Sequence, residues 1–122
     1  MHCFAFTPIK DATPAQWDAW HKATDALPSK MPFVKHVWYG KLRGPLAILG
    51  TTDAEARKKA VAGESASGPL TVTRREYGAC FWFDGGADVL KQYTSHPYHK
   101  EWSAAYEKVR VAGTTTYDII GQ

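Results

Sequence analysis

The stretch YGACFWFDGGADVLKQYTSHPYHKEW, residues 77–102, decides the fold, because a strand pattern passes there into a helical pattern that a proline divides. Its first seven residues, 77–83, alternate in the way that is typical of a strand with one face in the core. That face carries Ala79, Phe81 and Phe83. The turn DGGAD, residues 84–88, then separates the strand from the helical part.

The proline predicts two helices rather than one. The ring of Pro97 disfavours helical backbone geometry at His96, so we expect the first helix over residues 87–94. Proline is favoured at the first position of a helix, so we expect the second from Pro97 to Val111. Its apolar side chains recur at helical spacing and are expected in the core; they are Trp102, Tyr106 and Val109.

Two strand patterns flank a helix in the first third of the chain. Residues 2–6, HCFAF, alternate as a strand does. Thr13 and Gln16 have the spacing of a capping box, which predicts a helix that ends at Pro28. Residues 33–41, FVKHVWYGK, alternate again and predict the next strand.

An insert over residues 45–76 precedes the strand at 77–83. The four residues from Thr52 to Glu55 have the pattern of a capping box that opens a short helix through about Ala62. Residues 69–76, PLTVTRRE, are typical of a short edge strand. Our hypothesis is that the short helix covers the mouth of a pocket.

A last strand is expected over residues 114–120, so the order is strand, helix, strand, insert, strand, two helices and strand. This order predicts an α+β, ferredoxin-like split βαβ fold with a four-stranded antiparallel sheet, in one domain over residues 1–122. Helices cover one face of such a sheet, but these strands carry large apolar side chains on both faces, as Trp82 and Phe83 show. The sheet of a second copy is the simplest cover for the other face, so we expect a homodimer.

The composition is that of an ordinary globular protein, with 44% hydrophobic residues, 22% charged residues and a net charge of +3. The basic residues are scattered, so we expect no nucleic-acid partner. No apolar segment approaches membrane-spanning length, and the first residues lack the pattern of a signal peptide, so we expect a cytoplasmic location and no membrane partner. Cys3 and Cys80 have neither zinc nor CxxC spacing and are expected to be buried, reduced thiols.

The order of elements, VKHVWYGK after a helix and a proline, and QYTSHPYH near the C-terminus together resemble the stress-responsive A/B barrel (Dabb) family. The resemblance covers residues 1–43 and 77–120, and HPYH at residues 96–99 is its most specific element. It implies a dimeric α+β barrel. In a plant polyketide cyclase of that family, a tyrosine and the second histidine of this motif are catalytic, and they correspond to Tyr93 and His99 here.

The residues themselves suggest chemistry for the same pair. His99 is the third residue of the expected second helix, where the helix dipole disfavours the imidazolium and favours a ring that can accept a proton. The break at Pro97 lets Tyr93 and His99 converge on one point. The histidine could then take a proton from a carbon between two carbonyls, while the tyrosine hydroxyl stabilises the enolate, and no cofactor is needed.

Other roles remain open for these residues and their neighbours. His99 and Tyr93 could equally be structural, through hydrogen bonds in the core, and His96 is expected to cap the second helix. A metal at His96 and His99 is disfavoured because no carboxylate or cysteine lies at ligand spacing. Haem occurs in related dimeric barrels, but no residue here argues for it. The candidates for substrate binding are His36, Trp38, Phe81 and His96, whereas His21 is expected to be exposed on the first helix.

Two functions follow. The first is a cofactor-independent acid/base catalyst, a polyketide cyclase-like enzyme or related lyase, that acts on a small β-dicarbonyl or aromatic-type substrate. The second is a non-catalytic small-molecule-binding or stress-responsive dimeric barrel, in which the same residues only shape a cavity.

Overall fold

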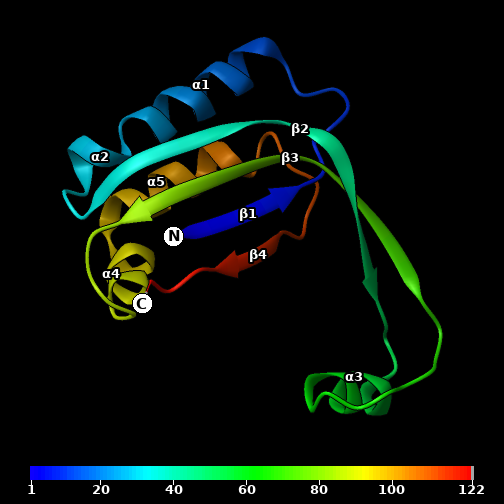
Figure 1. Cartoon of the computed structure of the whole chain (residues 1–122). Helices are drawn as coiled ribbons and strands as arrows, with labels where there is room; N and C mark the ends of the chain where they lie inside the picture. Colours follow the sequence, from blue (N-terminus) through cyan, green and yellow to red (C-terminus); the bar gives the residue numbers. More distant parts are fainter. Residues whose placement is uncertain (122) are drawn as a thin grey trace.

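The computed structural model describes residues 1–121, and its elements follow the expected order (Figure 1). They are β1 (His2–Phe6), α1 (Pro14–Asp25), α2 (Leu27–Lys30), β2 (Val34–Gly50), α3 (Ala54–Val61), β3 (Thr71–Phe83), α4 (Val89–Ser95), α5 (Pro97–Tyr106) and β4 (Thr115–Asp118). The sheet order is β2-β3-β1-β4, and all neighbouring strands are antiparallel. The predicted α+β fold with a four-stranded antiparallel sheet is therefore confirmed.

The capping box at the start of α1 is present. The Thr13 hydroxyl accepts a hydrogen bond from the Gln16 amide at 3.3 Å, and the Gln16 side chain accepts one from the Thr13 amide at 2.8 Å. The prediction that Pro28 ends this helix is wrong. The helix ends at Asp25, and Pro28 lies in the first turn of α2, where its missing amide hydrogen leaves no bond unmade.

The core lies between one face of the sheet and the helices α1 and α5. Aromatic rings dominate it, with Phe6 against Trp20 at 5.7 Å and Phe4 against Trp102 at 5.9 Å between ring centroids. The Trp102 indole also donates a hydrogen bond of 2.9 Å to the fully buried Thr24 hydroxyl, which ties α5 to α1. The residues predicted for this core from α5 and the turn after it are all buried: Trp102, Tyr106 and Val109.

The helix α5 is shorter than expected, because it ends at Tyr106 rather than at Val111. The backbone after it bonds to the start of the chain instead of continuing the helix. The Ile9 amide donates to the Val109 carbonyl at 2.8 Å, and the Val111 amide donates to the Thr7 carbonyl at 2.8 Å. These bonds satisfy backbone groups that a longer helix would have satisfied internally.

The second half of β2 and the first half of β3 extend beyond the body of the protein as a ribbon with α3 at its tip, and we call residues 46–75 the arm (Figure 1). The expected end of the second strand at residue 41 is therefore wrong. The strand expected at residues 69–76 is present from Thr71, but it is continuous with the strand at residues 77–83 rather than separate. The two halves pair with each other from Leu46↔Arg75 to Gly50↔Thr71, so their backbone groups are satisfied without the body.

The expected short helix is present as α3, but its cap differs from the prediction. The Asp53 carboxylate accepts a hydrogen bond of 2.7 Å from the Ala56 amide, so Asp53 is the N-cap. Thr52 does not start the capping box that the sequence suggested, because the helix begins one residue later than that box requires.

Cys3 and Cys80 form a disulfide, so the expectation of two reduced thiols is wrong. The two residues are 77 positions apart in the sequence but lie directly opposite each other in β1 and β3, with Cα atoms 4.1 Å apart. Only the register of the sheet brings them together, and spacing along the chain contains no sign of it.

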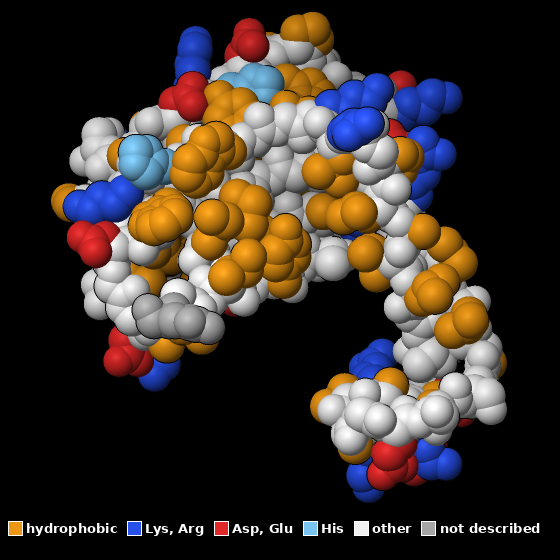
Figure 2. All heavy atoms as spheres, viewed as in Figure 1, with side chains coloured by type: hydrophobic (Ala, Val, Ile, Leu, Met, Phe, Trp, Pro, Cys, Tyr) orange, Lys and Arg blue, Asp and Glu red, His pale blue; other side chains and the backbone are white. Residues whose placement is uncertain are grey.

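No helix within residues 1–121 covers the sheet face that carries this disulfide, and we call it the open face. Its aromatic side chains Trp38, Trp82 and Tyr117 are each about half exposed, at 50%, 49% and 53%. Figure 2 shows hydrophobic side chains over this face and along the arm. Those of the arm are Leu46, Leu49, Val61, Leu70 and Val72.

No helix among residues 1–121 has both the length and the apolar character needed to cross a membrane.

Candidate functional site

A cavity of about 360 Å³ opens where the end of β3, the start of β1, the end of β4 and the helix α4 meet. Its walls are mainly apolar, and two carboxylates and one imidazole supply the polar side chains. The lining residues are Met1, His2, Trp82, Phe83, Asp84, Gly85, Gly86, Ala87, Val89, Leu90, Asp118, Ile119, Ile120 and Gly121. A mainly apolar cavity with a few polar groups is typical of a small-molecule site.

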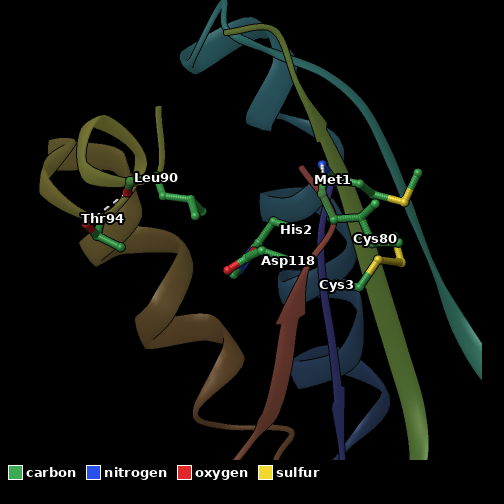
Figure 3. Close-up of polar contacts among 8 residues, drawn as sticks. Met1, His2, Cys3, Cys80, Leu90, Thr94 and Asp118 are labelled. Carbon is green, nitrogen blue, oxygen red and sulfur yellow. Dashed lines mark hydrogen bonds and ion pairs between the residues drawn. A yellow bond between two sulfur atoms is a disulfide. The ribbon is translucent and has the colours of Figure 1, made fainter. Parts of the chain in front are cut away.

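His2 and Asp118 form a hydrogen-bonded pair in the cavity wall. They are direct partners in the β1–β4 register, and His2 Nδ1 lies 2.7 Å from Asp118 Oδ1. An ionised carboxylate only accepts, so Nδ1 carries the hydrogen of this bond. The ring stacks on Phe83 at 5.9 Å between centroids. Figure 3 shows the pair on the α4 side of the sheet and the Cys3–Cys80 disulfide on the other side.

Tyr93 and His99 come together next to this wall. The ring of Tyr93, from α4, meets the ring of His99, from α5, edge to face with centroids 4.6 Å apart. Pro97 at the first position of α5 separates the two helices, so the two side chains approach from different directions. The convergence that the proline predicted is therefore present.

The Tyr93 hydroxyl is the unusual group of this pair. The side chain is 2% exposed, and its hydroxyl has no hydrogen-bond partner among residues 1–121. Burial, with a smaller contribution from Tyr106, raises its pKa far above the ordinary value. It therefore stays protonated and can donate. Its neighbours include the rings of Phe83 at 5.1 Å and His2 at 5.6 Å, both of which line the cavity.

His99 is half-buried, and its pKa is lowered from the ordinary value. The direction agrees with the neutral ring expected from the sequence, but the cause differs. Burial contributes most and the nearby His2 contributes next, whereas the sequence argument relied on the helix dipole. A neutral His99 can accept a proton near neutral pH.

The other residues expected to bind substrate do not line the cavity. His96 is the N-cap of α5, where its Nδ1 accepts a hydrogen bond of 3.1 Å from the Tyr98 amide. Phe81 is fully buried in the core, with its ring 6.2 Å from that of Tyr93. His36 and Trp38 lie together on the open face, with rings 5.6 Å apart. The structure thus places these four residues in three different environments.

His21 is not exposed as expected, because its ring is half-buried and stacks on Tyr39 at 4.9 Å. Its Nε2 lies 3.3 Å from the Tyr77 hydroxyl. A histidine on a helix face next to two tyrosines is a packing residue here.

Sequence reasoning missed His2 and Asp118. The alternation of residues 2–6 contains a usable signal, because a period of two places His2 on the same face as the core residues Phe4 and Phe6. Asp118 has no such signal. Its position opposite His2 depends on the strand register, which the pattern of residues 114–120 does not specify.

The hypothesis that the short helix covers the pocket mouth is wrong. No residue of the arm lines the cavity, and α3 lies at the far tip of the arm (Figure 1). Among residues 1–121, no group of three or more His, Cys, Asp or Glu side chains is arranged to hold a metal ion.

Comparison with known proteins supports the fold of this chain alone. No family model matches the chain, and no curated protein matches it. A dimeric ferredoxin-like protein of unknown function from Thermobifida fusca matches with a TM-score of 0.57 and 20% identity, over 95% of this chain and 84% of that one. The protein At3g17210 of Arabidopsis thaliana matches with a TM-score of 0.62 and 12% identity, over 99% and 93%.

A third solved structure, a dimeric protein of unknown function and ferredoxin-like fold from Bacteroides fragilis, matches with a TM-score of 0.50 and 16% identity, over 97% of this chain and 93% of that one. Identities this low support the architecture alone. The chain has the ferredoxin-like α+β fold that is described for the first and the third of these proteins.

Proposed function

We propose that the protein is a cofactor-independent acid/base catalyst that acts on a small β-dicarbonyl or aromatic-type substrate. One observation carries this proposal: Tyr93, whose buried hydroxyl has no partner among residues 1–121, packs its ring against that of His99 beside the wall of a cavity, and the pKa of His99 is lowered by burial. A buried hydroxyl without a partner is costly, so its retention favours a partner that arrives with a ligand. The resemblance of the QYTSHPYH stretch to the catalytic motif of olivetolic acid cyclase, a plant polyketide cyclase of the Dabb family, adds support.

The proposed step is proton abstraction followed by ring closure. A ring nitrogen of His99 takes the proton from a carbon between two carbonyls, and the electron pair of that C–H bond becomes the enolate. The Tyr93 hydroxyl donates a hydrogen bond to the enolate oxygen as its charge develops. The enolate carbon then attacks another carbonyl carbon of the same substrate, and the π electrons of that C=O bond move to its oxygen to give an alkoxide. The protonated His99 returns its proton to this alkoxide. Protons and charge balance without a cofactor.

Access to Tyr93 requires movement in the cavity wall. The hydroxyl is buried, and the rings of His2 and Phe83 are its neighbours in the cavity wall. A ligand in the cavity therefore has to displace one of these rings, or shift α4, before it reaches Tyr93. The His2–Asp118 pair would then be the first polar group that a ligand meets.

The test is hydrogen exchange at the carbon between the two carbonyls of a β-keto ester with an alkyl tail, followed by proton NMR in deuterated buffer. We expect the protein to accelerate the exchange above the buffer rate. Tyr93→Phe and His99→Gln should each reduce the acceleration at least tenfold. Unchanged exchange in both folded variants would refute the proposal.

A second function, a non-catalytic small-molecule-binding or stress-responsive barrel, is favoured by one different observation. The cavity is lined by neither Tyr93 nor His99, and it can hold a ligand without either of them. In that case a ligand binds the wild type and the Tyr93→Phe variant equally, and the exchange assay shows no acceleration by either.

Self-association is part of the proposal. The open face exposes Trp38, Trp82 and Tyr117, and two of the similar structures are described as dimeric. We propose that two copies pack their open faces together, because large exposed apolar patches mark interaction surfaces. Sedimentation equilibrium at micromolar concentration should give twice the mass of one chain. The mass of a single chain at that concentration would refute the proposed dimer.

A cytoplasmic location, the absence of a cofactor and the absence of a nucleic-acid partner stay predictions. The disulfide is more usual in oxidising compartments, so a cytoplasmic location is compatible with it only if this bond resists cellular reductants. Mass spectrometry of freshly lysed, alkylated cells would decide between the disulfide and free thiols. Purified protein should show neither cofactor absorbance nor nucleic-acid absorbance.

A further inference from the structure

A buried arginine lacks a counter-charge at the end of the sheet opposite the cavity. Arg75, in β3, is only 8% exposed. Its Nε donates to the Thr115 hydroxyl at 3.3 Å, and its Nη1 donates to the Thr7 hydroxyl at 3.1 Å. No carboxylate forms an ion pair with it among residues 1–121. Hydroxyl oxygens satisfy hydrogen bonds but do not neutralise the charge, and an unneutralised buried charge is costly.

A second guanidinium, that of Arg110, is connected to Arg75 through Tyr106 and the loop before β4. Arg110 sits over the ring of Tyr106 at 4.8 Å from the centroid, and its Nε is buried without a hydrogen-bond partner in the described chain. Its contact with the exposed Glu107 is long, at 4.0 Å. Burial raises the pKa of the Tyr106 hydroxyl to about 12, whereas its hydrogen bond with Thr114 and the charges of Arg110 and Arg75 act in the opposite direction.

The loop before β4 closes over this pair with small and hydroxyl-bearing residues. Gly113 has a φ of +96°, and a Cβ built there would lie 3.5 Å from Arg75 Nη2, the arginine nitrogen without a hydrogen bond among residues 1–121. Thr114 contributes a hydroxyl 3.0 Å from that of Tyr106. The positive φ favours glycine at this position, and the glycine leaves the free guanidinium nitrogen without a side chain against it.

We propose that Arg75 and Arg110 form a binding site for an oxyanion, either a phosphate or a carboxylate group, between β3 and the loop before β4. Guanidinium groups match the paired oxygens of both anions, and hydroxyls of the surrounding threonines can donate to them. The anion would supply the charge that the chain does not. It can come from a small molecule in solution or from a carboxylate of a second copy, because the chemistry is the same.

The experiment uses inorganic phosphate as the probe, with chloride at equal ionic strength as the reference. Phosphate should raise the midpoint of thermal unfolding in a saturable way, by about 4 °C at ten times its Kd. Arg75→Gln should abolish this rise. The matched control is Arg74→Gln, because Arg74 is the adjacent residue but is exposed and paired with Glu76 at 2.8 Å. The control should keep the full rise.

A second source of the anion has its own signature. If a second copy supplies the carboxylate, Arg75→Gln weakens self-association at least tenfold in sedimentation while phosphate leaves the wild-type midpoint unchanged. Either result supports an oxyanion site. A rise of the wild-type midpoint with phosphate identifies a free anion as the ligand.

A third measurement avoids dependence on the variant folding. In the wild-type protein, the Nε–H NMR signals of Arg75 and Arg110 should shift together during the phosphate titration, or differ between monomer and dimer. Two results together would overturn the proposal. The Nε–H signals would stay constant both during the phosphate titration and between monomer and dimer, and phosphate would change the unfolding midpoint equally in Arg75→Gln and Arg74→Gln. The arginines would then be structural hydrogen-bond donors only.

Discussion

Tyr93 combines complete burial with a hydroxyl that has no partner, although Tyr106 in the same core bonds its hydroxyl to Thr114 at 3.0 Å. This contrast leads to a prediction about stability. Tyr93→Phe should leave the free energy of unfolding unchanged or raise it by about 1 kcal/mol, because it removes an unsatisfied buried group. Tyr106→Phe, the matched control, should lower it by about 1 kcal/mol. Urea denaturation measures both.

A loss of stability in Tyr93→Phe equal to that in Tyr106→Phe would mean that Tyr93 has a partner in solution. The unpartnered hydroxyl would then no longer support a ligand site.

The lowered pKa of His99 makes stability depend on pH in a definite direction. Burial and His2 hold the folded-state pKa below the ordinary value of 6.5, so the unfolded chain binds the proton first as pH falls. The contribution of His99 to stability is therefore complete above about pH 6.5 and is lost as pH falls from there through the folded-state pKa.

The His99→Gln variant should show a shallower loss of unfolding free energy between pH 7.5 and pH 5 than the wild type does. Urea denaturation at several pH values measures the two slopes. Equal slopes would show that the ring is freely protonated in the folded state.

At the residue scale, prediction from sequence succeeded where a local rule applies. The amide of Tyr98 bonds to His96 because a proline follows His96, and that relation spans three adjacent positions. The pair His2–Asp118 escaped prediction because its two members are 116 positions apart. Only the assembled sheet brings them into contact.

The disulfide joins two elements, β1 and β3, at the centre of the open face. A link between residues 77 positions apart restricts the unfolded chain strongly, by about 4 to 5 kcal/mol on the loop-entropy estimate. Reduction of the wild type should therefore lower its unfolding midpoint markedly. The Cys3→Ala/Cys80→Ala double variant is the control, because a reductant should not change it. A wild type whose midpoint is insensitive to reductant would contradict the bond.

The arm should be separable from the body of the fold. Gly50 and Thr71 are paired residues, so a two-residue Asn-Gly turn can join them directly in place of residues 51–70. We expect this deletion to change the free energy of unfolding of the body by less than about 1 kcal/mol, because α3 contributes nothing to the core. Urea denaturation checks this, and loss of cooperative unfolding would show that α3 supports the body.

At the element scale, most elements could be predicted and their ends could not. The strand at residues 77–83 and both helices around Pro97 exist, because their periodicity reflects burial in one core. The sequence predicts the arm only as fragments, because its strand residues other than Arg75 are exposed or half-buried, so burial imposes no period-two pattern there. Pairing between β2 and β3 is what extends them.

At the scale of the whole molecule, the proposed dimer depends on the open face. Trp38 is half exposed there, and its replacement should weaken association at the centre of the proposed interface. We expect Trp38→Ser to raise the Kd of self-association at least tenfold in sedimentation. Val111→Ser, a similarly exposed apolar residue outside the open face, should leave it unchanged. Equal behaviour of the two variants would move the interface elsewhere.

The α+β architecture itself could be predicted from the order of the elements. Few arrangements bury the apolar faces of four strands and two helices between one sheet and one layer of helices. The site could be predicted only in part. Tyr93 and His99 meet as the proline suggested, but the cavity beside them is formed by both chain ends, whose positions depend on the completed sheet.

The most direct test of the catalytic proposal is the location of a bound β-keto ester by intermolecular NOEs. The account predicts NOEs from the ligand to the ring protons of His2 and Phe83, and to those of Tyr93 or His99. Loss of the Tyr93 or His99 contacts in a ligand that still contacts His2 would favour the non-catalytic barrel. NOEs only to Trp38 on the open face, or to the arm, would contradict the site altogether.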